Sequence, residues 1–479
     1  MKKTTFLTGM GLLCGFASFS QNDIDAMRYS QITFGGTARF SAMAGSMGAL
    51  GGDFSTLSFN PAGIGIYKKT ELMISPAIFY QKTTSTFNSR QAEDSKLNFN
   101  IGNIGIVATV KLKEESAWKN LNFGFGLNRT NNFHNRVLIE GGNKTSSLLD
   151  TYVNNANGYE SADFDGFSTG LAWQTYLINP TDTVNFLYDH VVKNYGQLQR
   201  KSVESSGAMS ETVISFGGNY NDKLMLGATI GIIKTRYYEE AVYEERDEQD
   251  TIDGFNFFTL NQNLTTRGTG VNFKIGAIYK ASDWLRLGAA IHTPTSITLK
   301  DEYNSSMQSD LDNNDHYEEK SKPGVFDYNI TTPFRAIGSA GFIINKTGLL
   351  NFEYEHVDYS MAKLRSTPQV FSEVNSAIRT KYKSTGNIRV GGEVRLDPIA
   401  IRAGYALYGS PFKTGENKHA DRTSYTAGLG FRENNYFIDF TYVLTMYNEK
   451  SYLYNPELLD AVTSKYKSSS FMLTMGVRF

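Results

Sequence analysis

The sequence has little cysteine, proline or net charge and no long apolar run in its main part. Its 479 residues include one Cys and 10 Pro, and the formal net charge is −1. A single cysteine excludes a disulfide scaffold, and a near-zero charge without a Lys/Arg block argues against nucleic-acid binding. A mean hydropathy of −0.34, with no apolar run of about 18 residues beyond the N-terminus, excludes a helical membrane protein. A soluble β protein or a transmembrane β-barrel remains, because alternating strands hide their apolar face from averages.

The first twenty residues are typical of a secretion signal. Lys2 and Lys3 form a basic start, an apolar stretch covers 6–19, and small Ser20 precedes Gln21. We therefore predict a signal peptide over 1–20 that is cleaved before Gln21. The mature chain would contain no cysteine, since the single one lies at position 14, and an exported protein without thiols fits a bacterial envelope.

Most of the remaining chain shows the two-residue period of β-strands. In 121–128 Leu and Phe alternate with Asn and Gly, and in 387–396 Ile, Val and Leu mostly alternate with Asn, Arg and Glu. Such strands have two unlike faces. A soluble sandwich would bury the apolar face, whereas a barrel in lipid would turn it outward and keep the charges in its lumen. The period alone does not decide between them.

The spacing of the strands favours the barrel. Short turns are expected to alternate with long polar loops at 82–99, 134–209, 239–265 and 301–327, and the acidic run 239–250 is expected to be an exposed loop. A closed antiparallel barrel with both termini at its periplasmic end predicts this alternation. We therefore predict an all-β protein with a 14-stranded antiparallel transmembrane β-barrel over 67–479. Its strands are expected at 70–81, 100–113, 119–133, 210–220, 223–238, 266–280, 284–300, 328–344, 347–361, 384–396, 398–408, 421–431, 435–447 and 468–479.

The segment before the first strand has a different composition. Residues 33–65 hold eight glycines and too few large side chains to build a core of their own. Glycine-rich backbone packs closely when other structure surrounds it. A disordered linker is the alternative, but Phe34, Phe40 and Leu57 make the segment rather apolar for one. We predict that 21–66 form an N-terminal hatch, or plug, inside the barrel.

Asn60-Pro61-Ala62 stands between the glycine-rich segment and the first expected strand. Here the chain resembles the FadL/OmpP1/TodX family of outer-membrane transporters for long-chain fatty acids and other hydrophobic compounds, in which a hatch ends in Asn-Pro-Ala before the first of fourteen strands. Further matching segments follow in family order at 284–292, 332–338, 351–356, 401–405 and 410–411. The resemblance implies passive uptake, with capture at outer loops, gating by the hatch and sideways release into the membrane.

Two groups of residues are candidates for this role. The gate candidates are Phe54, Phe59, Asn60, Pro61 and Ala62, where Pro61 fixes a bend and the Asn60 amide can bond to the wall; a purely structural turn is the alternative. The loop 134–209 concentrates aromatic residues, which on an outer surface usually mark binding. Its ligand-capture candidates are Phe164, Phe167, Trp173, Tyr176, Leu177, Phe186 and Tyr188. The alternative is that they form a small core within the loop.

Charged residues on the predicted strands are assigned to the lumen. We expect them to pair with one another rather than to line an apolar tunnel. The six His show no metal-ligand spacing and no catalytic motif is present, so we predict no metal, no cofactor and no enzyme activity. The lumen charges are Glu353, Glu355, Arg389, Glu393, Arg395 and Arg402.

The leading hypothesis is therefore a monomeric channel in the outer membrane of a Gram-negative bacterium. Its partners would be a hydrophobic small molecule or lipid, the outer-membrane lipid, and the assembly machinery, since the last strand alternates apolar residues and ends on Phe479. Nucleic acid is not expected. The alternative is a protein-binding barrel, because the outer-membrane shuttle of type IX secretion resembles the same family. An outer-membrane enzyme is a third class, but no Ser/His pair can be nominated for it.

Overall fold

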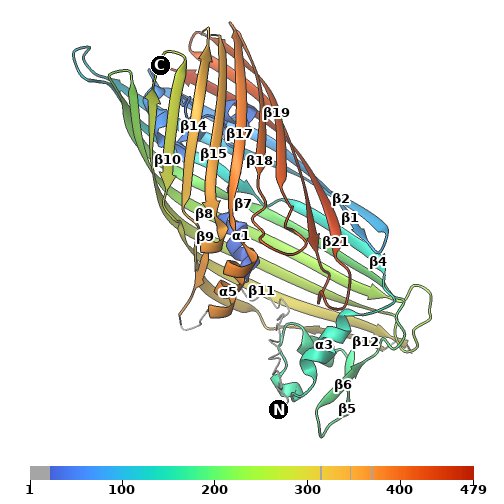
Figure 1. Cartoon of the computed structure of the whole chain (residues 1–479). Coiled ribbons are helices and arrows are strands. Elements are labelled where there is room, and N and C mark those ends of the chain that lie inside the picture. The colour runs from blue at the N-terminus through green and yellow to red at the C-terminus, as the bar shows by residue number, and fades with distance from the viewer. Residues whose placement is uncertain (1–21, 313–314, 346, 368–370) are drawn as a thin grey trace, which may run out of the picture.

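A single sheet closes on itself in the structure, which is a computed structural model. It describes residues 22–479 except 313–314, 346 and 368–370, so the predicted signal peptide lies outside the described residues. The sheet closes where the first strand, β1 (Glu71–Phe87), pairs antiparallel with the last, β21 (Val462–Arg478). Figure 1 shows the resulting barrel with its long, tilted strands. No helix in the described part of the chain is long and apolar enough to cross a membrane.

The barrel has 14 antiparallel strands, which confirms the predicted fold class. Three further strands prolong the wall: β4 (Asn135–Gly142) follows β3, β11 (Ser296–Leu311) follows β10, and β13 (Gly324–Thr331) precedes β14. Two short strands, β12 (Asp315–Lys320) and β16 (Lys363–Arg365), pair with β11 and β13. Between β1 and β21 the wall contains β2 (Arg90–Lys111), β3 (Trp118–Asn132), β7 (Leu198–Tyr220), β8 (Leu224–Arg246), β9 (Phe257–Lys280), β10 (Leu285–His292), β14 (Arg335–Ile344), β15 (Gly348–Asp358), β17 (Ser384–Leu396), β18 (Ile399–Tyr408), β19 (Arg422–Glu433) and β20 (Tyr436–Ser451).

Two neighbouring strands are interrupted by a Thr-Pro pair. Residues 293–295 separate β10 from β11, and residues 332–334 separate β13 from β14. Proline has no N–H to give to the ladder, which explains the breaks. The wall stays closed because the N–H of Thr332 donates to the Thr295 carbonyl and the Thr295 N–H to the Thr332 hydroxyl, each over 2.9 Å.

The two faces of the wall differ as a membrane barrel requires. Large apolar side chains point outward, with Phe123 58% exposed, while the lumen contains buried ion pairs. Arg389 lies 2.8 Å from both Glu353 and Glu355, and Arg402 lies 2.6 Å from Glu393. Arg395 also pairs with Glu393, at 2.7 Å, so the predicted lumen charges do pair with one another. An apolar belt outside and paired charges inside indicate insertion in lipid.

Three of the four segments predicted to be long polar loops consist mainly of strand, so the prediction is wrong for them. Segments 82–99, 239–265 and 301–327 extend β1, β2, β8, β9 and β11, and a tight turn at Asn88 and Ser89, with positive φ of 45° and 65°, joins β1 to β2. These extensions do not show the regular alternation of apolar and polar residues that marks the rest of the wall, and the backbone ladder continues the strand. The acidic run 239–250 likewise lies mainly in β8, where Glu245 is fully buried.

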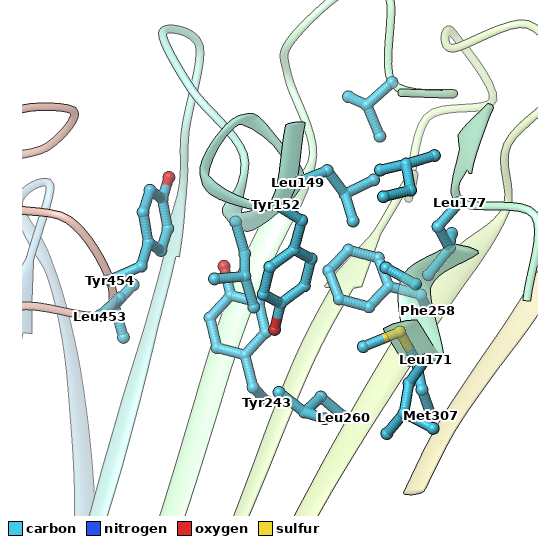
Figure 2. Packing of buried hydrophobic residues seen from close by; sticks show 14 of the residues in the cluster. Leu149, Tyr152, Leu171, Leu177, Tyr243, Phe258, Leu260, Met307, Leu453 and Tyr454 are labelled. Carbon is cyan, nitrogen blue, oxygen red and sulfur yellow. The ribbon is translucent and has the colours of Figure 1, made fainter. Parts of the chain in front are cut away.

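A small outer domain (residues 143–197) lies at the barrel end opposite the C-terminus (Figure 1). It contains α3 (Leu148–Ala156), the 3-10 turn η3 (Ser161–Asp163), α4 (Thr169–Gln174) and the hairpin β5 (Ile178–Asp182) and β6 (Leu187–His190). Figure 2 shows its core, in which Leu149, Tyr152 and Leu171 pack on Tyr243 and Phe258 of the strand extensions. The domain is therefore built on the wall rather than loosely attached to it.

The inner segment (residues 22–70) lies within the barrel. It contains α1 (Asp23–Ser30), α2 (Ala38–Ala42) and the 3-10 turns η1 (Phe54–Ser58) and η2 (Pro61–Ile66). Most of its side chains are buried, and its elements contact wall strands on several sides, including β2, β8, β9 and β18–β21. On the side of the outer domain, Asp23 of α1 bonds to Lys381 at the end of α5 (Ser372–Lys381), at 2.9 Å. A 3-10 turn, η5 (Tyr359–Met361), packs beside α5.

Candidate functional site

A chamber of about 1040 Å³ lies between the inner segment and the outer half of the wall. This volume is at the upper end of the range for small-molecule sites. Its lining is mixed, so it suits a ligand with an apolar body and a polar end. The main apolar lining residues are Met27, Phe34, Ala77, Phe79, Phe133, Tyr408, Phe412, Val443 and Met472, and the charged ones are Asp23, Arg28, Arg129, Lys381, Glu416, Arg422, Glu449 and Lys450.

Beside this chamber the hydrogen-bonded ladder of the wall is broken. The pairing of β2 with β3 ends at Asn103 and Asn128, although β2 begins at Arg90 and β3 reaches Asn132. Beyond this point β2 pairs with β1 and β3 pairs with β7. The ladder does not resume farther along the described parts of β2 and β4, and a side-chain contact bridges the gap where the Asn98 amide nitrogen lies 3.0 Å from Nε2 of His134. We call this region, residues 98–103 and 128–134, the window.

Two irregularities in the neighbouring ladders accompany the window. The β1–β2 register shifts between Ser75 and Pro76, which leaves Gly102 without a partner on β1. The β3–β7 register shifts between Arg129 and Asn131. Bulges bend a strand and increase its twist, so they account for the divergence of β2 from β3.

The backbone of the inner segment fills the window. The N–H of Thr33 donates to the Thr130 carbonyl over 3.0 Å. Thr33 thus takes the place that a residue of β2 would hold in the ladder. The Asn131 amide donates to the carbonyl of Gln31 over 3.2 Å. A Cβ on Gly102 would lie 2.8 Å from the Gly36 carbonyl oxygen, so the close approach requires glycine. Residues 31–36 thus separate the chamber from the outside of the barrel.

Large apolar side chains flank the window on the outer face. Leu97 and Phe99 on β2 are 67% and 65% exposed, and Phe125 on β3 is 59% exposed. In a barrel within a bilayer such residues face the lipid tails. A molecule leaving the chamber through the window would therefore meet hydrocarbon.

The five gate candidates lie deeper, against the wall, and all are buried. The Asn60 amide donates to the Gly48 carbonyl at 2.7 Å and to the Ala277 carbonyl of β9 at 3.3 Å, so it bonds to the wall as expected. Its side-chain oxygen caps η2 by accepting from the Ala62 N–H, at 3.1 Å. The Pro61 carbonyl presses on Gly227 of β8, where a Cβ would lie 2.2 Å away. The Asn-Pro-Ala motif therefore anchors the inner segment to β8 and β9.

The two phenylalanines of this group also contact the wall. The ring of Phe54 covers Gly105 of β2. The Phe59 carbonyl accepts from Nε2 of His292 over 2.7 Å, and its ring lies 5.1 Å from the Arg389 guanidinium carbon. The contacts of these five residues with three sides of the barrel hold the base of the inner segment in place.

Charged and polar groups add further anchors at the same base. Arg39 of α2 donates to Glu393 at 2.9 Å, and both side chains are buried. The N–H of Gly48 donates to Glu353 at 2.7 Å, and the Asn351 amide donates to the Ser46 hydroxyl at 2.9 Å. The buried lumen charges thus bind the inner segment as well as each other.

The seven capture candidates lie together in the outer domain. Leu177 and Tyr188 are in its core, which is shared with the strand extensions, and Phe164, Trp173 and Phe186 pack against that core. Phe167 and Tyr176 instead pack on Tyr303 and Tyr317, with ring centres 5.0 and 4.6 Å apart, and Tyr176 is 52% exposed. Their role in ligand capture remains a prediction.

Sequence reasoning missed the window and the residues around it. Two signals were present in the sequence, since Pro76 and Gly102 both lie inside strands where each usually marks a bulge or a close backbone approach. Neither residue alone indicates that two strands separate, because that depends on pairing between distant segments.

These features define a transmembrane outer-membrane barrel of the transport class. The sequence profile of the outer membrane protein transport protein family (OMPP1/FadL/TodX) matches residues 219–479. This is more than half of the chain, and the chain belongs to this family. It is therefore an outer-membrane protein of the Gram-negative type, from a family of transporters of hydrophobic compounds. No curated protein sequence matches the chain.

Solved structures of family members share the fold. The toluene transporter TodX of Pseudomonas putida is 12% identical, with a TM-score of 0.55 over 93% of this chain and 99% of its own. A FadL homologue of Pseudomonas aeruginosa is 16% identical, with a TM-score of 0.55 over 94% and 99%. The toluene transporter TbuX of Ralstonia pickettii is 14% identical, with a TM-score of 0.50 over 94% and 100%. At these identities the likeness establishes the fold alone.

Proposed function

We propose that the protein takes up hydrophobic small molecules, such as long-chain fatty acids, and releases them sideways into the outer membrane. The observation that carries the proposal is the window, which links a ligand-sized chamber to the lipid side of the wall. Transfer of an apolar chain from water to the chamber and then to lipid is favourable by about 25 cal/mol per Å² of buried apolar area. No energy source other than the concentration gradient is needed.

The outer domain is proposed as the first contact for the ligand. Exposed Tyr176, packed on Tyr317, offers aromatic surface, and Phe167 packs on Tyr303 elsewhere in the same domain. Trp173, Phe186 and Tyr188 support that surface from the core of the domain. A ligand captured there would have to pass the loops at the chamber mouth to reach the lumen.

The inner segment is proposed to act as the hatch, with a fixed base and a moving part. The base carries the Asn-Pro-Ala motif and the buried Arg39–Glu393 pair. By contrast, residues 31–36 are held to the window by three hydrogen bonds, two from the N–H and hydroxyl of Thr33 to the Thr130 carbonyl and one from the Asn131 amide. A hydrogen bond contributes about 0.5–1.5 kcal/mol net, so this part can open at modest cost while the base stays bound.

A disulfide lock tests which part moves. The predicted mature chain has no cysteine, so the substitutions Thr33→Cys and Thr130→Cys introduce a single possible intramolecular disulfide. Oxidation should hold residues 31–36 in the window and stop uptake of a fluorescent long-chain fatty acid by cells lacking their own channel for it. A reductant should restore uptake.

The matched control places the lock at the base, as Ser46→Cys with Asn351→Cys, where the two side chains already meet at 2.9 Å. This lock should leave uptake unchanged. Uptake that continues through the oxidised Thr33/Thr130 pair would reject release through the window.

A further inference from the structure

We infer that a basic patch on the outer face of the barrel binds the phosphate groups of lipid A, the phosphorylated glycolipid of the outer leaflet. The patch consists of four exposed cations on three neighbouring strands, namely Lys234 and Arg236 on β8, Arg267 on β9 and Lys300 on β11. The inference concerns the outside of the wall, so it does not depend on the proposed uptake through the lumen.

The patch lies between the apolar belt and the outer domain. Along β8 the outward side chains change from Ile230 and Ile232, which are 43% and 39% exposed, to Lys234 and Arg236. Farther along the same strand, Tyr243 belongs to the core of the outer domain. A transmembrane strand leaves the hydrocarbon where its outward residues cease to be apolar. The patch is therefore at the level of the lipid head groups, on the side of the outer leaflet.

The cations face one another across neighbouring strands. Arg236 on β8 is directly opposite Arg267 on β9, and Arg267 is in turn opposite Lys300 on β11. Residues directly opposite in an antiparallel pair have Cβ atoms about 4.5–5.5 Å apart, and like charges in such pairs are destabilising. Three cations in one row repel one another, and a bound anion would relieve this repulsion.

The carboxylates around the patch are too few to balance it. A groove of about 310 Å³ runs over these strands, and its lining includes all four cations but a single carboxylate, that of Asp327. Glu302 lies 2.8 Å from Lys300 and 4.0 Å from Arg267. Within the described part of the chain, neither Lys234 nor Arg236 forms an ion pair, in contrast to Lys300. Positive charge therefore remains in excess along the groove.

Two further cations continue the patch along the wall. Lys363 and Arg365 on β16 are exposed and stand opposite Thr331 and Asn329 of β13. Asn329 is in turn opposite Thr298, which lines the groove. The basic surface thus extends across β8, β9, β11 and β16, which is wide enough to contact more than one phosphate group.

Exposed cations on another part of the outer wall are paired instead. Arg136 on β4 lies 2.6 Å from Glu204, and Arg200 on β7 contacts Glu140. Their side chains are 44% and 46% exposed, so exposure alone does not leave a cation unpaired. The excess charge over β8, β9 and β11 is therefore a local property, which is expected of a binding surface.

The chemistry of the patch and its surroundings specifies the ligand. A guanidinium binds phosphate through two parallel hydrogen bonds, and clusters of basic residues at a membrane surface bind anionic head groups. Toward the middle of the membrane, exposed Ile232, Val271 and Phe273 follow on the same face and can contact acyl chains. The chain is of the Gram-negative outer-membrane type. In such a membrane the phosphate-bearing lipid of the outer leaflet is lipid A, so we assign lipid A as the occupant.

The test measures binding of diphosphoryl lipid A to the purified full-length protein in detergent by native mass spectrometry. Arg236→Gln with Arg267→Gln should weaken this binding about twentyfold, because each basic residue at an anionic lipid surface contributes a factor of about five. Lipid A freed of its phosphates should bind weakly to the wild-type protein and to this variant alike. Heat-modifiable migration in gels shows that each barrel is folded.

The matched control removes the same charge from the paired cations, as Arg136→Gln with Arg200→Gln. It should leave binding of diphosphoryl lipid A unchanged. An equal loss in this control would mean that only the total charge matters, and wild-type binding by the Arg236/Arg267 variant would exclude the patch as the site. Both results would overturn the inference.

Phosphatidylglycerol separates lipid A from other anionic lipids. The wild-type protein should bind it more weakly than diphosphoryl lipid A, and equal affinities would reject lipid A as the specific occupant. Uptake of a fluorescent fatty acid by the same variants reports on the proposed function separately. Lost lipid A binding with retained uptake supports the inference, whereas lost uptake with unchanged lipid A binding contradicts it.

Discussion

The contact between the Asn-Pro-Ala motif and the wall allows a sharp prediction. A methyl group added at Gly227 would lie 2.2 Å from the carbonyl oxygen of Pro61 and 2.8 Å from the backbone nitrogen of Ala62. These are backbone atoms, which cannot rotate away as a side chain would. Ordinary contact begins at 3.4 Å, so Gly227→Ala must displace η2 or the wall by about 1.2 Å.

The free-energy cost of Gly227→Ala has two parts, overpacking and the loss of nearby hydrogen bonds. Overpacking of a tight contact costs about 1–3 kcal/mol. A shift of this size would also break the bonds from Asn60 to the Ala277 carbonyl, at 3.3 Å, and from Thr229 to the Leu57 carbonyl, at 3.1 Å. Each is worth about 0.5–1.5 kcal/mol, so the docked state should lose about 2–6 kcal/mol. The undocked population of the inner segment should rise by about thirtyfold or more.

Conductance in planar bilayers measures this population directly. Gly227→Ala should open the lumen and raise the ion conductance, while heat-modifiable migration in gels shows that the barrel itself is folded. Gly338→Ala in β14 is the matched control, because nothing lies within 4 Å of its added methyl group. A folded Gly227→Ala barrel with wild-type conductance would refute the anchoring role of this contact.

Three further predictions concern the ends of the chain and the outer domain. Deletion of 22–62 should convert the barrel into a leaky channel, and unchanged conductance would reject the hatch. Removal of Phe479, whose N–H bonds to the Thr70 carbonyl at 2.9 Å, should impair assembly, and normal heat-modifiable folding of the truncated chain would contradict this. Trp173→Ala with Phe186→Ala should weaken uptake of a fluorescent fatty acid because both side chains pack against the outer core, and wild-type uptake would remove the outer domain from the route.

The wall within the membrane could be predicted from the sequence, because lipid on the outside and paired charges in the lumen require apolar and polar residues to alternate along each strand. The strand 384–396 was expected at its observed bounds, and the pairing of Arg389 with Glu353 follows from the same orientation. Beyond the membrane this constraint disappears. Glu245 looks like part of a solvated acidic loop, yet it is buried because Ser147 and Gln199, far away in sequence, donate to it at 2.6 and 3.0 Å.

The window could not be predicted for a related reason. The alternation of β3 continues through Phe125 and Leu127, and nothing in β3 itself indicates that it leaves β2 after Asn128. The break arises from two bulges and from the inner segment, which supplies Thr33 as a substitute partner. Only the assembled barrel brings these distant segments together.

The loop between β20 and β21 joins two parts of the molecule that are otherwise distinct. Its Leu453 and Tyr454 belong to the core of the outer domain, where the Tyr454 hydroxyl lies 2.8 Å from that of Ser146. Its Tyr452 and Pro456, immediately beside them, line the chamber. This short loop therefore contacts the core of the outer domain with two residues and lines the chamber with two others. A tilt of the outer domain would change the width of the chamber mouth, even though no residue of 143–197 lines it.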